Sequence, residues 1–306
     1  MKTVGILARP DLDKAAPVLQ ELVRWLQERG LTPCLEERTA ALQSDAAARA
    51  GARPGREVAA RADALVVLGG DGTLLAASHL LDERKVPVLG VNFGSLGFLT
   101  EITLPELFPV LEAVLAGRYE YEERRLLRVR VRRQGQPDHV DDVLNDAVVT
   151  KATLSRIIEL EVVVDGLFVS RFRADGLIVS SPTGSTAYNL AAGGPILHPA
   201  LPAVVLTPIC PHMLTNRPLV IGDDAVIEVR LRGGREGDVH LTFDGQQGFP
   251  LRQQDCVTIT RSPRHLRLVK SPDRDYYEVL RRKLKWGEPT AVRSPEGSGP
   301  GSGSDA

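Results

Sequence analysis

The chain has 306 residues, of which 43% are hydrophobic and 25% are charged, and its formal net charge is -1. This length favours two domains with substantial cores, and the composition is ordinary for a globular protein. The balanced charge gives no reason to expect binding to nucleic acid or to an acidic membrane surface.

Three features bear on the cellular compartment. Cys34, Cys210 and Cys256 are scattered and form no C-x-x-C pair, which indicates reduced thiols in a cytoplasmic protein. The apolar start at residues 4–8 meets Arg9-Pro10 and is interpreted as a first strand, not as a signal peptide. No apolar run approaches the length of a membrane span.

Predicted strands and helices alternate over the first 120 or so residues. Strands are predicted over 4–8, 31–35, 64–68 and 86–91, and helices over 15–29, 74–81 and 104–115. Gly30 ends the first helix and Thr103 caps the last. The Ala/Arg-rich stretch 40–61 favours helix at 46–50, and Pro54-Gly55 is expected to break it. This alternation predicts a parallel sheet that is covered on both faces.

The pattern changes near Tyr119, and short strands with period-two alternation continue to about Lys270. Asp165-Gly166 is a strong two-residue hairpin signal between strands at 160–164 and 167–170. Further strands are predicted over 127–131, 226–231, 239–243 and 257–259, a short helix over 186–192, and a C-terminal helix over 275–286. The sequence therefore predicts a β-rich second domain.

The run Gly69-Gly70-Asp71-Gly72-Thr73 follows an apolar strand and opens a helix. Glycines let the backbone approach a phosphate, and the first amides of a helix lack internal partners and carry partial positive charge. Asp71 then lies where a hydroxyl can be deprotonated or a metal ion held. The alternative is a tight turn with a capping aspartate, but the doubled glycine and the following helix favour an anion site.

Three more segments carry polar groups at strand ends. Asn92-Phe93-Gly94 also follows a strand, so its loop would share a crevice with the first one. Asn145-Asp146 places an amide and a carboxylate between apolar flanks, which suits vicinal ribose hydroxyls. The segment 175–195 combines a strand, a Pro/Gly/hydroxyl turn and a helix start. The simpler alternatives are a glycine-rich turn, a polar strand end and an elaborate helix cap, and for the first two the sequence leaves the choice open.

Several other enzyme classes fail on spacing. There is no Walker-type G-x-x-x-x-G-K, no G-x-G-x-x-G after the first strand and no G-x-S-x-G hydrolase elbow. The six histidines form no close pair, so a histidine-ligated metal is not expected.

Taken together, the motifs resemble the NAD kinase family of the bacterial type. The glycine-aspartate loop, Asn92-Phe93-Gly94, Asn145-Asp146 and the 175–195 segment fall in the family's order and approximate spacing, as do 208–218 and Asp244-Gly245-Gln246. The resemblance covers about 4–287. The loop alone is shared with lipid kinases and phosphofructokinase-type enzymes, whereas 175–195 is far more specific. The family often has Asn-Glu where this chain has Asn145-Asp146, which is interpreted as a tolerated variant.

The resemblance implies an α/β N-terminal domain with a Rossmann-like, phosphofructokinase-like parallel sheet and an all-β sandwich C-terminal domain, with a C-terminal helix that returns to the first domain. The expected divisions are 1–121, 122–270, 271–288 for that helix, and 289–306 for a disordered tail. It also implies a phosphotransferase with an alcohol acceptor, which moves the terminal phosphate of ATP to the 2′-hydroxyl of the adenosine ribose of NAD and gives NADP. Mg²⁺ is expected, held by phosphates and water, because no carboxylate cage is visible.

The resemblance also assigns roles to residues. Asp71 is the expected general base, or at least orients the hydroxyl, and Gly69, Gly70 and Thr73 form the phosphate loop. Asp175 is expected to reach a neighbouring subunit's site, in a homodimer or homotetramer with shared pockets. The expected NAD contacts are Asp71, Gly72, Phe93, Asn145, Asp146, Arg156, Arg173, Asp175, Thr183, Thr186, Ala187, Tyr188, Asn189, Ala191 and Gln246.

Two rival functions remain at this stage. A lipid kinase of the same superfamily would leave the 175–195 segment unexplained. A sensor that binds NAD or NADP without turnover is disfavoured by the intact Asp71. The choice between ATP and polyphosphate, the acceptance of NADH, the oligomer size and feedback by NADP or NADPH are left open, although Arg173 favours oxidised NAD on the resemblance.

Overall fold

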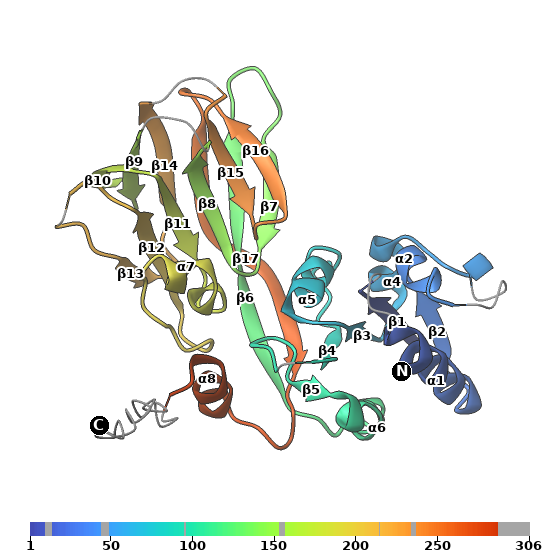
Figure 1. Cartoon of the computed structure of the whole chain (residues 1–306). Helices are drawn as coiled ribbons and strands as arrows, with labels where there is room; N and C mark the ends of the chain where they lie inside the picture. Colours follow the sequence, from blue (N-terminus) through green and yellow to red (C-terminus); the bar gives the residue numbers. More distant parts are fainter. Residues whose placement is uncertain are drawn as a thin grey trace, which may run out of the picture.

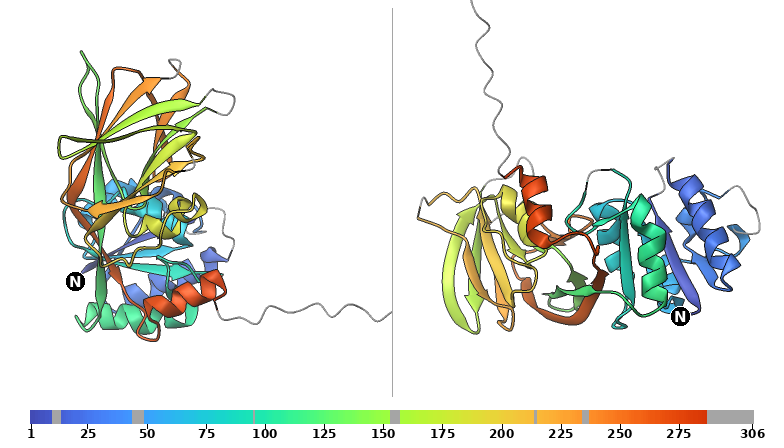
Figure 2. Two further views of the ribbon diagram at one scale, coloured as in Figure 1. Left: turned by 90° about the vertical axis from the view of Figure 1, so that its left-hand side faces the viewer. Right: turned by 90° about the horizontal axis from the view of Figure 1, so that it is seen from below.

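The computed structural model describes residues 1–9, 14–43, 49–94, 96–152, 157–213, 215–233 and 237–286. The chain forms an N-terminal α/β part and a C-terminal β-sandwich, joined by two long strands (Figures 1 and 2). The predicted tail at 289–306 lies outside the described residues, as does the predicted helical stretch 46–50 in large part.

The N-terminal part is built on a parallel sheet in the order β4-β3-β1-β2, as the alternation predicted. Its strands are β1 (Thr3–Ala8), β2 (Thr32–Leu35), β3 (Ala64–Leu68), β4 (Pro87–Asn92) and the short β5 (Ile102–Thr103). Its helices are α1 (Ala15–Glu28), α2 (Glu37–Ala40), α4 (Gly55–Arg61), α5 (Asp71–Ser78), the 3-10 turn η1 (Leu104–Glu106) and α6 (Leu107–Leu115).

Helices cover both faces of this sheet. Apolar residues of α1 and α6 pack on one face, and those of α4 and α5 on the other. The strand β3 is buried along its whole length, as expected for a strand covered on both sides. The helical stretch is interrupted before Gly55, as predicted, and a new helix, α4, begins there with Pro54 as its N-cap. Proline is compatible with a helix start, where its missing N–H has no intrahelical partner.

The sandwich consists of two antiparallel layers that enclose one apolar core. One layer has the order β13-β12-β11-β8-β15-β16. The other contains β10-β9-β14-β17, followed by β6, which pairs with β17, and β7, which pairs with β6. The strands are β6 (Tyr121–Arg132), β7 (His139–Val143), β8 (Asp146–Lys151), β9 (Ile158–Val164), β10 (Leu167–Ala174), β11 (Gly176–Ser180), β12 (Ala203–Ile209), β13 (Leu219–Gly222), β14 (Ile227–Gly233), β15 (Val239–Phe243), β16 (Gln247–Leu251) and β17 (Cys256–Val269). The Asp165-Gly166 hairpin is confirmed, with both residues at positive φ.

The strands β6 and β17 connect the two parts (Figure 1). The first half of β17 pairs with β14 in the sandwich, and its end pairs in parallel with β4. One mixed sheet therefore runs through both parts. The elements η2 (Gly184–Thr186), α7 (Tyr188–Ala191) and α8 (Tyr276–Leu284) lie outside these sheets.

The C-terminal helix α8 returns to the N-terminal part, as predicted. Just before it, Arg274 donates to the Glu101 carbonyl oxygen at 2.8 Å and forms an ion pair with Glu106 at 2.9 Å. The Tyr276 hydroxyl donates to the Leu197 carbonyl oxygen at 3.3 Å, beyond the end of α7. The helix is thus held between the two parts (Figure 2).

Candidate active site

The glycine-aspartate loop joins the carboxyl end of β3 to the first turn of α5. The helix begins at Asp71, three residues before the predicted start, with Gly70 as its N-cap. A carboxylate in the first turn is favourable at the positive end of the helix dipole, which explains the earlier start. A Cβ at Gly69 would lie 2.4 Å from Thr73 Oγ1, so only glycine fits there. The loop thus presents helix-start amides at the edge of the sheet.

The Asp71 carboxylate is held by the segment that follows Asn92-Phe93-Gly94. Its Oδ1 accepts hydrogen bonds from the amides of Leu99 and Thr100, both at 3.0 Å, and from the Thr100 hydroxyl at 2.9 Å. Its Oδ2 accepts one, from the Phe98 amide at 2.8 Å. A Cβ at Gly97 would lie 2.0 Å from Asp71 Oδ1, so this close approach requires glycine. The two glycine loops therefore form one crevice, as their positions after neighbouring strands indicated.

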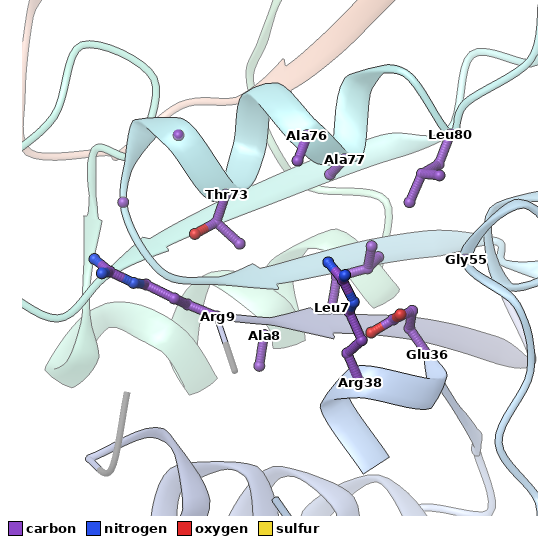
Figure 3. Close-up of a pocket in the computed structure, with 12 residues that line it drawn as sticks. Leu7, Ala8, Arg9, Glu36, Arg38, Gly55, Thr73, Ala76, Ala77 and Leu80 are labelled. Atoms are coloured by element: carbon purple, nitrogen blue, oxygen red, sulfur yellow. The ribbon is translucent and has the colours of Figure 1, made fainter. Parts of the chain in front are cut away.

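The crevice at Asp71 has a volume of about 360 Å³. Phe93 and Asn92 line it from the end of β4, while Arg9 and Lys283 bring positive charge from the end of β1 and from α8. A second cavity of about 500 Å³ lies between α5, β1 and α2, and Arg9, Gly70, Thr73 and Arg38 line it. Figure 3 shows Arg9 extending from the end of β1 toward the first turn of α5. Such a set of amides and cations suits a polyphosphate group.

Arg9, Arg38 and Lys283 were missed by the sequence analysis. Arg9 directly follows the first predicted strand, so its place at the carboxyl edge of the sheet was a usable signal. Lys283 lies more than 200 residues from Asp71, and only the packing of α8 brings it to the crevice.

Asn145 and Asp146 form the turn between β7 and β8, and the surrounding chain holds the backbone of this turn. The amides of Leu144, Asn145 and Asp146 donate to the Asp244 carboxylate at 2.9, 2.7 and 3.0 Å. The Asn145 carbonyl oxygen accepts from the Ser181 amide at 2.9 Å, which joins the turn to the 175–195 segment. Leu144 also shares a core cluster with residues of α5, so the turn adjoins the helix that carries Asp71.

The two side chains of this turn are left available. Asp146 is only 5% exposed. Neither Asn145 nor Asp146 makes a side-chain hydrogen bond or ion pair within the described part of the chain. Burial, and then the negative charge of Asp244, raises the pKa of Asp146 to about 7. A buried carboxylate without a protein partner is costly, so this geometry favours a ligand that donates hydrogen bonds.

The segment 175–195 divides into a buried and an exposed side. The exposed or half-exposed side consists of Thr186, Ala187, Tyr188 and Ala191, and Thr183 lies buried beneath it. Asn189, another expected NAD contact, is fully buried, and its side-chain amide makes hydrogen bonds within the chain. It donates to the Ser185 and Pro195 carbonyl oxygens at 3.0 Å each and accepts from the Thr207 hydroxyl at 2.6 Å. Its side chain therefore shapes this segment from within.

The remaining predicted contacts lie apart from the Asp71 crevice. Arg173 is exposed on β10, and Gln246 is exposed in the turn before β16. Asp175 forms an ion pair with Lys151 at 2.8 Å. Arg156 lies outside the described residues.

Comparison with known proteins agrees with this geometry. Residues 4–119 match the family model for the ATP-NAD kinase N-terminal domain, and residues 144–271 match that for the ATP-NAD kinase C-terminal domain. The NAD kinases of Geotalea daltonii and Citrifermentans bemidjiense are 50% and 51% identical over 288 residues, which is 94% of this chain and 100% of each relative.

Solved structures show the same fold. Yeast NADH kinase complexed with NADH superposes with a TM-score of 0.85 at 25% identity, covering 96% of this chain and 90% of that one. An NAD kinase from Archaeoglobus fulgidus in complex with ATP superposes with a TM-score of 0.73 at 24% identity, covering 94% of this chain and 100% of that one.

The fold, the glycine-aspartate loop at the sheet edge and the cationic crevice define a phosphotransferase. Within that class, the chain belongs to the NAD kinase family. No helix within the described residues is long and apolar enough to cross a membrane.

Proposed function

We propose that the crevice at Asp71 transfers the terminal phosphate of ATP to the 2′-hydroxyl of the adenosine ribose of NAD, giving NADP. The observation that carries the proposal is that one helix, α5, places Asp71 beside the anion-binding loop and packs against the turn that holds the unpartnered Asp146. Membership of the NAD kinase family supports the acceptor, and the family's ATP-NAD kinase domains support the donor.

NAD would lie along the boundary between the two parts. Asn145 and Asp146 would bind the nicotinamide-side ribose, because an amide and a carboxylate without protein partners can accept from vicinal hydroxyls. Phe93 would contact the adenine, since it lines the Asp71 crevice. Thr186, Ala187, Tyr188 and Ala191 would line the dinucleotide with Thr183 beneath them, and Gly72, Arg173 and Gln246 complete the proposed contacts.

Asp71 would act on the acceptor hydroxyl through Oδ2. A carboxylate offers about four acceptor sites, and Oδ1 already has three donors whereas Oδ2 has one. Oδ2 can therefore accept a hydrogen bond from the 2′-hydroxyl, orient its oxygen toward the terminal phosphate and take its proton as the new P–O bond forms and the bond to the leaving ADP breaks. Phosphoryl transfer depends chiefly on this positioning and on charge stabilisation.

The donor would bind at the loop 69–73 as its Mg²⁺ complex. The amides of the first turn of α5, together with Arg9 and Lys283, would contact its phosphates. Among the described residues no group of three or more His, Cys, Asp or Glu side chains is arranged to hold a metal ion. The cation would be held by the phosphates of the donor and by water. The ion would neutralise charge on the transferred phosphate. Inorganic polyphosphate presents the same chemistry and is a second candidate donor.

The complete enzyme is proposed to be a homodimer or homotetramer that works in the cytoplasm. Asp175 lies at the start of β11, paired with Lys151 and away from the Asp71 crevice of its own chain, which fits a contact to a partner's site. Cys34, Cys210 and Cys256 are all free thiols, which suits a reducing compartment.

The direct test is an NADP-specific coupled assay with purified protein, Mg²⁺, ATP and NAD. The wild type should form NADP, and Asp71→Asn should lower kcat by about 100-fold or more, as expected for loss of a general base, while NAD still binds. Full activity in Asp71→Asn would refute the role of Asp71. Binding of NAD without any NADP in the wild type would instead indicate a sensor, and phosphorylation of a lipid would indicate the lipid kinase alternative.

A further inference from the structure

The aspartate of the Asp244-Gly245 turn makes contacts that its turn does not require. Asp244 and Gly245 have φ values of 51° and 64° and lie in the three-residue connection, 244–246, between β15 and β16. Asp165-Gly166 is a two-residue hairpin whose φ values of 50° and 79° are similar. The Asp165 carboxylate accepts one amide, from Val226 at 2.8 Å near the surface. The Asp244 side chain is instead 0% exposed and accepts three amides from the 144–146 turn.

A fourth partner of Asp244 comes from the other part of the molecule. His79 is the C-cap of α5, and its Nε2 lies 2.9 Å from Asp244 Oδ2. Its Nδ1 lies 3.6 Å from Oδ1 of Asp141, in the middle of β7. Asp141 and Asp244 raise the pKa of His79 to about 9, so it carries positive charge at neutral pH. The Asp244 carboxylate is therefore neutralised from one side and fixed by the turn on the other.

Through these contacts, α5 connects Asp71 to the turn that carries Asn145 and Asp146. Asp71 is its first residue and His79 directly follows its last, so the reacting carboxylate and the imidazole are separated by eight residues, or about 12 Å of helix. The Arg264 guanidinium also holds the C-terminal end of α5, by donating to the Ser78 carbonyl oxygen at 2.8 Å. The helix thus stays in place independently of His79.

We propose that Asp244, neutralised by His79, is a positioning residue that holds Asn145 and Asp146 in the geometry that binds the ribose, in fixed relation to Asp71. This inference rests on the proposed role of Asn145 and Asp146. Because Asp244 uses backbone amides, it orders the turn without occupying either ligand-binding side chain. The negative charge of Asp244 also raises the pKa of Asp146, whose carboxylate has no hydrogen-bond partner among the described residues.

The test compares Asp244→Asn with Asp165→Asn, which makes the same change in another Asp-Gly turn with similar φ values. An asparagine at 244 keeps one oxygen and places an NH₂ group either against the Leu144 amide and His79 or against the amides of Asn145 and Asp146, so the turn should relax. We expect the KM for NAD to rise at least 10-fold in Asp244→Asn, with the KM for ATP changed less than twofold. Asp165→Asn should leave both KM values at those of the wild type. NAD affinity is also measured by calorimetry in the Asp71→Asn background, where turnover is suppressed.

Two variants at His79 keep the test decisive if Asp244→Asn does not fold. His79→Gln should raise the KM for NAD in the same direction, and His79→Arg, which keeps a cation, should restore it toward the wild type. An unchanged KM for NAD in folded Asp244→Asn or His79→Gln would overturn the proposal. Equal increases in the KM for NAD and the KM for ATP would overturn it as well. Wild-type NADP formation is measured first, so a failure of the proposed reaction is distinguished from a failure of this inference.

Discussion

At the scale of single residues, the site contains two carboxylates in opposite conditions. Asp71 accepts from four hydrogen-bond donors, whereas Asp146 is buried and its side chain has no donor among the residues that the structure describes. The first arrangement fixes the carboxylate in the orientation that its proposed role toward an acceptor hydroxyl requires. The second leaves a group whose charge depends on pH and on the ligand. The same residue type thus serves two purposes because the local backbone differs.

The raised pKa of Asp146 predicts pH-dependent NAD binding. Its pKa is about 7, so the carboxylate becomes ionised as the pH rises from 6 to 8. The ionised form is the stronger acceptor for ribose hydroxyls, so NAD affinity should increase over this interval. Calorimetric titration of NAD at several pH values tests this, with Asp146→Asn as the variant that should abolish the dependence. A flat profile for the wild type would contradict the assignment of Asp146.

At the scale of elements, the C-terminal helix α8 completes a crevice that the N-terminal part begins. The helix is anchored by Asp275, whose carboxylate caps it by accepting from the Glu278 amide at 2.8 Å. Val279 and Leu280 are buried, so one face of the helix is fixed. Lys283 forms no hydrogen bond or ion pair with the described residues, yet it lines the Asp71 crevice. This combination is typical of a cation that serves a ligand.

Removal of the Lys283 charge should weaken phosphoryl transfer. A charged hydrogen bond to phosphate is worth about 1.5–3 kcal/mol, so Lys283→Met should lower kcat/KM for ATP by roughly 10- to 100-fold. The KM for NAD should change little. Arg282→Ala is a matched control on the same helix, because Arg282 forms an exposed ion pair with Glu278. Equal kcat/KM for ATP in Lys283→Met and the wild type would exclude this role.

At the scale of the whole molecule, α5 and the strands β6 and β17 bind the two parts into one structure. The His79 contacts with Asp141 and Asp244 join the parts electrostatically, and β17 joins them through its pairing with both β4 and β14. Relative motion of the parts would therefore have to break buried ion pairs.

The charge on His79 predicts a loss of stability at alkaline pH. Its pKa is about 9 in the folded protein and about 6.5 ordinarily, so the folded state binds the proton more tightly. The stabilisation is complete below pH 6.5 and is lost as the pH rises through about 9, with a total on the order of 3 kcal/mol. Urea unfolding at pH 6.5 and pH 9.5 measures it. His79→Gln should show a smaller difference between the two pH values than the wild type.

Much of the architecture followed from local pattern. Strict alternation of strand and helix predicted the parallel sheet, and Asp165-Gly166 predicted a hairpin, because both depend on neighbouring residues. The starts of helices depended more on context. Pro54-Gly55 begins α4, since a proline that stops one helix is equally suited to start the next.

The sequence by itself determined the chemical groups of the site and the order of its motifs, since these depend on residue type and spacing. Only the tertiary structure decided how those groups are used. It saturated Asn189 internally, left Asp146 without a partner, and brought Lys283 and His79 to groups far away in the chain. The physical reason is that burial and hydrogen-bond satisfaction are properties of the packed chain, because each depends on residues that the sequence alone does not place together.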